Sequence, residues 1–330
     1  MKKTFAVISA AVLLLAFGGI CKASDEDFII ENGVLTEYAG RDIYVKIPGG
    51  VDTIGDGAFR RNKNIVRVEI PGSVKEIGER AFKDCTSLKI VEGMGEIVGK
   101  SAFDGCISLE EIPQLSVATE IHANAFEGCV KLPFFALGEN LKEIGSYAFA
   151  GCTKLDSVFI PKNVEIIGSG AFMNCSGLKT VIFDAEKRHG IREVGERAFY
   201  ECRNLDSVNF PDSVEEIGPY AFFGSGIRSA HVGGDGNIQS YAFAACPGLE
   251  SVTLSDTLSG VGDHAFAECT MLSRVKMSDY TIADPSAFEG CPLLETGGGG
   301  QQTGTVKPNV FPQWNPELAA AYEFMKNIHK

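Results

Sequence analysis

Hydrophobic residues recur along most of the chain in one order and at one spacing. In residues 155–160, which read LDSVFI, a leucine is followed three residues later by a valine, and buried and outward-facing positions then alternate. Alternation with a period of two is typical of a β-strand that has one face in the core. Pro161 follows directly and ends the strand, because proline has no N–H group to donate to a sheet. The pattern therefore predicts one short strand in each repeat.

A second phrase follows each predicted strand. In residues 74–85 it reads VKEIGERAFKDC, a short apolar segment followed by glycine, alanine, phenylalanine and cysteine at fixed places. Gly78 suits either a turn at positive φ or a close approach of two backbones. Residues 79–83 are expected to form a single helical turn. Asp84, which is glycine or asparagine in most other copies, suits a left-handed end to that turn.

The phenylalanine of this phrase occurs eleven times at a near-constant step, which is 23 residues in most cases. One unit cannot bury its own apolar residues, whereas stacked units bury them against each other. The sequence therefore predicts a curved solenoid with a parallel sheet on one side and turns and short helices on the other. The eleven copies are Phe59, Phe82, Phe103, Phe126, Phe149, Phe172, Phe199, Phe222, Phe243, Phe266 and Phe288.

These phrases carry a resemblance to a known family. Leu-x-x-Val-x-Ile-Pro-x-x-Val-x-x-Ile-Gly-x-x-Ala-Phe-x-x-Cys is similar to the repeat of BspA-like leucine-rich repeat surface proteins. The resemblance implies a right-handed leucine-rich-repeat solenoid of the α/β repeat class, with about eleven units. It also implies an exported, cell-surface or extracellular protein that binds a protein ligand, because some proteins of this family are adhesins for host proteins. It does not specify the ligand.

The ends of the chain differ from the repeats. Lys2 and Lys3 precede an apolar run, as in a secretory signal peptide, and cleavage is expected after Ala23. The alternative is lipid attachment at Cys21, which would make the protein an outer-membrane lipoprotein and provide its only contact with a membrane. The expected parts are a signal peptide (1–23), an N-terminal cap (24–43), the repeat array (44–295), a flexible linker (296–308) and a tail with a short helix (309–330).

Nine of the ten cysteines lie three residues after the repeated phenylalanine. Asn62 and Ser225 take this place in the other two units. A position that accepts cysteine, asparagine or serine requires a small side chain that can form a hydrogen bond. We therefore expect buried free thiols. The alternative, disulfides between neighbouring units, requires a shorter Cβ separation than stacked strands provide.

Composition and charge narrow the possible functions. The formal net charge of −13 argues against a nucleic-acid partner, which would require a basic surface. The five histidines have no metal-binding spacing, and neither a nucleophile elbow nor a phosphate-binding loop occurs. We expect no cofactor, no metal site and no catalytic residue, and we interpret the acidic residues as a solvated surface.

Outward-facing strand positions are the candidate binding residues, because solenoids bind partners through such rows. An apolar cluster over three adjacent units marks either an interaction site or a surface covered by other parts of the chain. A polar run further along suits a sugar or a peptide, or simply faces solvent. The apolar candidates are Phe134, Ala136, Phe159 and Ile182, and the polar candidates are Asn209 and His231.

The leading hypothesis is an exported, adhesin-like, non-enzymatic scaffold that binds a protein such as a host matrix or cell-surface protein. The alternative is a carbohydrate-binding protein for nutrient capture. Self-association through the open ends of the array is a third, structural possibility. The charged insertion at 184–190, which lengthens one step to 27 residues, is either a contact point or a tolerated loop.

Overall fold

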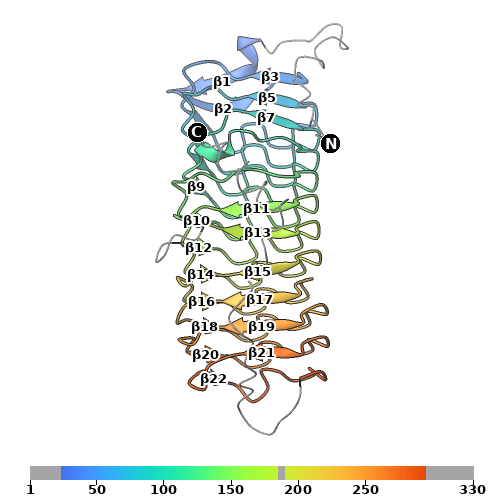
Figure 1. Cartoon of the computed structure of the whole chain (residues 1–330). Helices are drawn as coiled ribbons and strands as arrows, with labels where there is room; N and C mark the ends of the chain where they lie inside the picture. The colour runs from blue at the N-terminus through green and yellow to red at the C-terminus, as the bar shows by residue number, and fades with distance from the viewer. Residues whose placement is uncertain (1–23, 185–189, 295–330) are drawn as a thin grey trace, which may run out of the picture.

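Each repeat forms one coil of a β-solenoid and adds a two-residue strand to one long sheet, which is parallel except for its first pair, β1 and β2. The computed structural model describes residues 24–184 and 190–294. Figure 1 shows the coils stacked in a column from β1 at one end to β22 at the other. The 13 strands of the long sheet are, in spatial order, β1 (Phe28–Glu31), β2 (Val34–Tyr38), β4 (Thr53–Ile54), β6 (Glu76–Ile77), β8 (Ile97–Val98), β9 (Glu120–Ile121), β10 (Glu143–Ile144), β12 (Ile166–Ile167), β14 (Glu193–Val194), β16 (Glu216–Ile217), β18 (Asn237–Ile238), β20 (Gly260–Val261) and β22 (Ile282–Ala283).

The strand predicted from the Leu-x-x-Val pattern lies on a second side of the column and forms two separate parallel sheets. These sheets are interrupted between β7 and β11, where Pro113 and Pro133 cannot donate to a ladder. Only an isolated bridge from Ile90 to Glu111 extends the first of them. The strands are β3 (Tyr44–Lys46), β5 (Arg67–Glu69) and β7 (Ile90–Glu92), and then β11 (Ser157–Ile160), β13 (Thr180–Phe183), β15 (Ser207–Asn209), β17 (Ser229–Val232), β19 (Ser251–Leu254) and β21 (Arg274–Lys276).

The predicted helical turn is wrong; the segment folds as consecutive β-turns. The N–H groups of Ala81 and Lys83 bond to the carbonyl three residues earlier, whereas those of Phe82 and Asp84 donate to the next coil. Because alternate N–H groups point along the stack, a helix cannot form, and the turns add a third line of hydrogen bonds between coils. The left-handed residue at Asp84 (φ 61°) is confirmed.

The described residues contain no α-helix, and none of their helices is long and apolar enough to cross a membrane. They contain two 3-10 segments, η2 (Asp25–Asp27) and η3 (Leu115–Val117). The linker, the tail and most of the charged insertion predicted from the sequence lie outside the described residues, as does the segment expected to be a signal peptide.

The glycine that precedes the Ala-Phe pair in eight of the eleven units allows a close approach of two backbones. A Cβ atom on Gly168 would lie 2.7 Å from the backbone nitrogen of Ser146 and 2.8 Å from the carbonyl oxygen of Ile144. Neither Gly168 nor Gly78 has a positive φ. Of the two explanations offered from the sequence, the close approach is therefore confirmed and the positive φ is wrong.

The repeated phenylalanines form a single ladder along the axis of the column. Neighbouring rings lie 4.7–5.5 Å apart, and all pairs are stacked within 13° of parallel. At the N-terminal end Tyr38 packs against Phe59 at 5.1 Å and Phe28 against Tyr38 at 5.0 Å, with the rings tilted by 32° and 45°. The antiparallel β1–β2 hairpin, which carries Phe28 and Tyr38, therefore continues the ladder beyond the first complete repeat.

The cysteine column is a second buried ladder. All nine thiols in the described residues are free and buried. Each Sγ donates to the carbonyl oxygen of the phenylalanine one coil before, at 3.0–3.5 Å, as Cys175 does to Phe149 at 3.1 Å. The prediction of buried free thiols that form hydrogen bonds is confirmed.

Candidate binding surface

The outward side chains of the second set of strands form rows, because the parallel strands are in register. Phe159 pairs with Ile182, and further along Asn209 pairs with His231, which pairs with Thr253. Two positions earlier lies a row of small hydroxyl side chains, and this row faces the same side of the sheet. Its members are Ser157, Thr180, Ser207, Ser229 and Ser251. We call this side of β11–β21, together with residues 134–137, the outer face.

The N-terminal sheet of β3, β5 and β7 is covered by an internally satisfied ionic network. The Tyr44 hydroxyl donates to Glu69 at 2.5 Å, and Lys46 also bonds to Glu69. Arg67 forms two hydrogen bonds to Glu92 and lies over the Tyr44 ring. Burial raises the pKa of Tyr44 to about 12, and the hydrogen bond from Lys46 lowers the pKa of Glu69. These side chains bind each other, so this sheet offers few open groups to a ligand.

The apolar candidates lie next to this network along the column. Phe159 and Ile182 are half-buried and adjacent on β11 and β13. Phe134 is 49% exposed, and Ala136 is half-buried. The sequence placed Phe134 and Ala136 on a strand, but they lie in a segment outside the sheets, after Pro133. The alternation nevertheless persists, because Phe135 and Leu137 are buried between and after them.

The polar candidates Asn209 and His231 are exposed and adjacent on β15 and β17. Partial desolvation lowers the pKa of His231, opposed by the nearby carboxylate of Asp212. The imidazole is therefore neutral at neutral pH and can both donate and accept a hydrogen bond. The structure thus places the apolar and polar candidates on one continuous face, in two adjacent parts.

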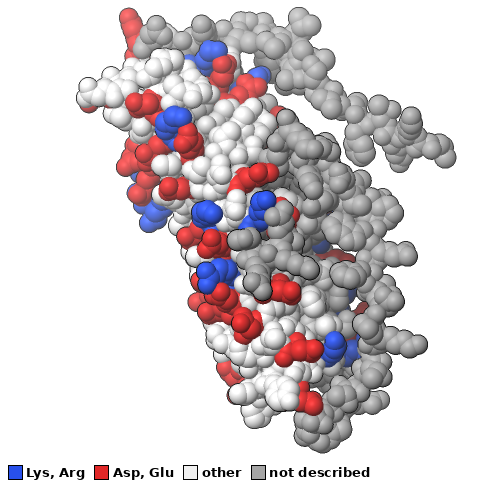
Figure 2. Space-filling model, turned by 60° about the vertical axis from the view of Figure 1, so that its left-hand side comes forward, with Lys and Arg blue, Asp and Glu red and all other residues white. Residues whose placement is uncertain are grey.

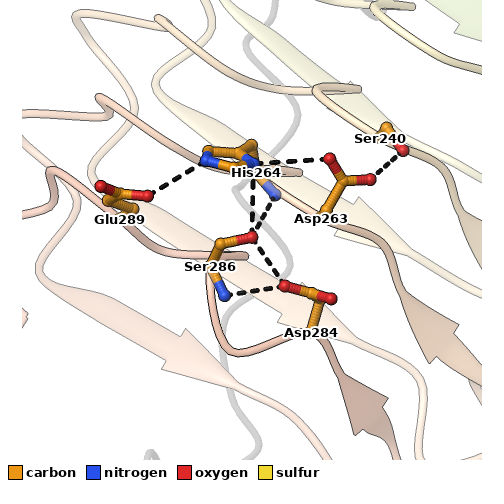
Figure 3. Close-up of polar contacts among 6 residues, drawn as sticks. All are labelled: Ser240, Asp263, His264, Asp284, Ser286 and Glu289. Carbon is orange, nitrogen blue, oxygen red and sulfur yellow. Dashed lines mark hydrogen bonds and ion pairs between the residues drawn. The ribbon is translucent and has the colours of Figure 1, made fainter.

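A polar cluster that the sequence analysis did not identify lies near the C-terminal end of the described column. Its members are Ser240, Asp263, His264, Asp284, Ser286 and Glu289 (Figure 3). Nδ1 of His264 lies 3.3 Å from Ser286 Oγ and 3.4 Å from Asp263 Oδ2, and Nε2 lies 3.0 Å from Glu289 Oε2. The Ser240 hydroxyl binds Asp263 and holds the pKa of that carboxyl below its usual range.

Serine, histidine and carboxylates together also occur in the active sites of hydrolases. The Ser286 hydroxyl donates to Asp284 Oδ1 at 2.6 Å, and its oxygen accepts from the backbone N–H of His264. Its proton is therefore directed at a carboxylate and not at the imidazole, which a nucleophile would require. The cluster links the last three described coils and does not form a nucleophile–base pair. Within residues 24–184 and 190–294, no group of three His, Cys, Asp or Glu residues is arranged to hold a metal ion.

Charged side chains cover the side of the column that carries the 13-stranded sheet. Figure 2 shows acidic and basic residues interspersed there, with acidic ones in excess. Several are paired across coils, such as Lys75 with Glu96 at 2.6 Å and Arg192 with Glu215 at 2.6 Å. Such exposed pairs contribute little to stability, and this side is interpreted as a solvated surface.

The chain was compared with known proteins. A family model described as BspA type leucine rich repeat region (6 copies) matches residues 43–112, 91–189 and 186–295, which together exceed half of the chain. The chain belongs to this family. A leucine-rich cell surface protein from Faecalibacterium prausnitzii is 26% identical; the match covers 82% of this chain and 93% of that one, with a TM-score of 0.47. A leucine-rich repeat protein from Bacteroides ovatus is 23% identical. The match covers 81% of this chain and 93% of that one, with a TM-score of 0.40. A comparison with curated proteins finds no match.

Membership of the BspA-type family accounts for the buried columns and leaves the exposed rows unexplained. The repeated leucine, valine, isoleucine, glycine, alanine, phenylalanine and cysteine are the residues that build and stack the coils. Phe134, Phe159, Asn209 and His231 all lie at variable positions between those columns. Any recognition specific to this chain must therefore come from the variable positions, since the repeat itself supplies only a rigid frame.

Proposed function

We propose that this BspA-type repeat protein is an exported, non-enzymatic scaffold that binds a protein ligand through its outer face. The observation that supports this most strongly is the exposed ring of Phe134, in the same part of the face as Phe159 and Ile182. Apolar side chains grouped on a surface mark interaction sites more often than isolated ones do. Aromatic residues are also enriched among those that dominate binding energy.

The stacked coils favour recognition without rearrangement. Parallel strands fix Phe159 beside Ile182, and the phenylalanine ladder beneath them holds neighbouring coils in place. A preformed face loses little conformational entropy when a ligand binds. A host matrix or cell-surface protein, which presents folded surfaces of its own, is the class of ligand we propose.

Substitution of Phe134 by serine tests the proposed site. We expect binding to immobilised extracellular-matrix proteins or to host cells to weaken by about tenfold or more, as for an aromatic residue at the centre of an interface. The affinity of the purified chain would be measured by surface plasmon resonance. Ile107→Ser is the matched control, because Ile107 is equally exposed (47%) and lies outside the outer face. Equal losses in both variants, or no loss in Phe134→Ser, would contradict the proposed site.

Export is proposed from the first residues of the chain and is tested separately. Mass spectrometry of the protein from its native cells is expected to find an N-terminus at Ser24. An N-terminal Cys21 that carries lipid would identify the lipoprotein form instead. A protein that retains Met1 or begins at Lys2 would contradict export by either route.

A second candidate ligand is a carbohydrate, and one observation favours it. The side chains of Ser207, Ser229 and Ser251 form no hydrogen bond to another described residue, and they lie beside Asn209 and His231. These groups are open to the hydroxyls of a sugar. Binding on a glycan array that is lost in Asn209→Ala and His231→Ala, but kept in Phe134→Ser, would support this candidate over the protein ligand.

A further inference from the structure

Five aromatic side chains form a continuous surface on the turns of four consecutive coils. Tyr220 stacks on Tyr241 at 5.0 Å, and Tyr241 stacks on His264 at 4.8 Å, with the rings within 5° of parallel. Tyr200 stacks on Phe223 at 5.3 Å, and Phe223 also contacts Tyr220 at 5.7 Å. All five side chains are partly exposed. We call these five residues the aromatic ladder.

The fold does not require aromatic residues at these places. The position of Tyr220, two residues before the core phenylalanine, is filled by Arg80, Ser101, Asn124 and Gly170 in other coils. The position of Phe223 is filled elsewhere by lysine, aspartate, glutamate or alanine. The aromatic residues therefore belong to this part of the chain and not to the repeat.

Backbone conformation makes this choice of residue more informative. Tyr220 and Tyr241 have φ values of 57° and 58°, and His264 has 53°. Positive φ is unfavourable for bulky side chains, and glycine or asparagine would adopt it at lower cost. Residues held in unfavourable conformations occur often at functional sites. Positive φ itself belongs to the repeat, since Arg80 and Tyr147 share it (both 57°); what distinguishes this part of the chain is that three successive coils place a ring there.

The ladder is open along its edges, and one of its ends is acidic. Because the rings cover each other's faces, a ligand meets ring edges and the tyrosine hydroxyls. At the N-terminal end the guanidinium of Arg197 lies over Tyr220, 5.4 Å from the ring centre. At the other end Asp263 and Glu289 flank the imidazole of His264 (Figure 3). Beyond His264 the column continues with Ser286, which has no ring and contacts the imidazole only through its hydroxyl.

This chemistry is complementary to a cation carried on an apolar segment. Because neighbouring rings cover most ring faces and Arg197 lies over Tyr220, an incoming arginine or lysine packs its apolar stem along the ring edges while its charged group reaches past them. Asp263 and Glu289 contact the imidazole, and Asp284 lies one hydrogen bond further away, on Ser286. These three carboxylates at the C-terminal end of the ladder attract positive charge. Aromatic residues surrounded by a polar rim are also typical of protein interfaces.

We propose that the aromatic ladder is a second interaction surface, which binds a polypeptide segment with arginine or lysine beside apolar side chains. The surface lies on the turns and shares no residue with the outer face. It is therefore independent of the function proposed above, and either proposal can fail alone. A neutral glycan is the other class of ligand with which exposed aromatic residues are compatible, and the test distinguishes it.

Selection of peptides against the whole chain tests the proposal. A phage-displayed library of random linear peptides would be selected on the immobilised protein, and the enriched peptides synthesised. Their affinities would be measured by fluorescence anisotropy for the wild type and three variants. Tyr220→Ser/Tyr241→Ser removes the ladder, and Glu289→Gln removes one carboxylate but keeps a hydrogen-bond acceptor for His264. Tyr147→Ser is the matched control, because Tyr147 has the same position and φ (57°) in a coil whose neighbours carry Asn124 and Gly170.

The expected result has three parts. Enriched peptides contain arginine or lysine next to aromatic or aliphatic residues, and their affinity falls as salt is added. The double variant weakens binding by about tenfold or more, and Tyr147→Ser by less than about twofold. Glu289→Gln weakens binding by about threefold and reduces the effect of salt. Because Glu289 is exposed, this variant folds even if the double variant does not.

Three results would overturn the proposal. The first is the absence of an enriched basic and apolar sequence. The second is unchanged affinity in both the double variant and Glu289→Gln, or an equal loss in Tyr147→Ser. The third is binding of neutral oligosaccharides that depends on Tyr220 and Tyr241 and is insensitive to Glu289→Gln, which would identify a glycan site.

Discussion

Replacement of Phe149 by alanine is expected to lower the free energy of unfolding by about 3–5 kcal/mol. The ring is completely buried and stacks on Phe126 at 5.3 Å, on Phe172 at 5.5 Å and on Phe135 at 4.2 Å. Its removal leaves a cavity between rigid coils. The hydrogen bonds between neighbouring coils prevent the surrounding residues from moving in to fill it. Denaturant unfolding followed by circular dichroism measures the change.

Phe288→Ala is the matched control for this prediction. Phe288 is the last ring in the ladder of core phenylalanines. Within the described residues it stacks on Phe266 alone, and it is only partly buried. Its replacement is expected to cost about 1–2 kcal/mol, because less apolar surface returns to water. Since repeat proteins gain much of their stability from contacts between neighbouring units, Phe149→Ala is also expected to broaden the transition. Equal losses of unfolding free energy in the two variants would show that the ladder of core phenylalanines does not act as a continuous core.

The repeat period made most of the architecture predictable. A side chain at a given place in one unit lies beside the same place in the next, so Phe149 and Phe172 could be placed together without any structure. The cysteine column was predictable for the same reason. Ser225 in that column showed that the position requires a small hydrogen-bonding group, and Ser225 does lie 3.3 Å from Cys246.

The local conformation of the turns was less predictable. An Ala-Phe pair between polar residues is compatible with a helical turn and with successive β-turns alike. Which of the two conformations forms depends on whether alternate N–H groups can donate to the next coil, as the N–H of Phe82 donates to the carbonyl oxygen of Ala102. Pro113 and Pro133 interrupt the second set of strands, and both are visible in the sequence. The interruption was nevertheless missed, because exposed Phe134 and buried Phe135 alternate as they would in a strand although no strand forms there.

The polar cluster and the aromatic ladder were missed because they occupy positions where the repeat varies. Tyr220 and Tyr241 are 21 residues apart, and their contact is invisible to any local pattern. Alignment of the units by their phenylalanines places them, with His264, in one column. The His264–Glu289 contact would still require the structure, because it joins two different columns of neighbouring coils.

The protein is expected to unfold cooperatively when the pH is raised above about 9, because its buried thiols cannot ionise in the folded state. Burial raises the pKa of Cys85 and of Cys175 to about 12, from an ordinary value of 9. The pKa values of six more cysteines are also raised, mainly by burial or by hydrogen bonds to neighbouring thiols. These six are Cys106, Cys129, Cys152, Cys202, Cys269 and Cys291.

The direction of the effect follows from the protonation of the two states. Below pH 9 the thiols are protonated in both states, and their contribution to stability is complete. Between pH 9 and the raised pKa values, only the unfolded chain loses these protons, so the free energy of unfolding falls as the pH rises. The contribution of each thiol approaches about 1.4 kcal/mol per pH unit as the unfolded chain becomes fully ionised, above about pH 10, so eight thiols give a limiting slope of roughly 11 kcal/mol per unit. That slope exceeds the effect of any single substitution and is large against the total stability of an ordinary domain.

Denaturant titrations between pH 8 and pH 10.5 under reducing conditions would measure this slope. Cys129→Ser/Cys152→Ser/Cys175→Ser is the matched variant, because serine already occupies the column at Ser225 and does not ionise in this range. Its slope is expected to fall to roughly 7 kcal/mol per pH unit, since five of the eight thiols remain. The slope does not depend on the variant's stability at neutral pH, so modest destabilisation by serine leaves the test intact. An unchanged slope would mean that other groups whose pKa is raised in the folded chain, such as Tyr44, and not the buried thiols, cause the loss of stability at high pH.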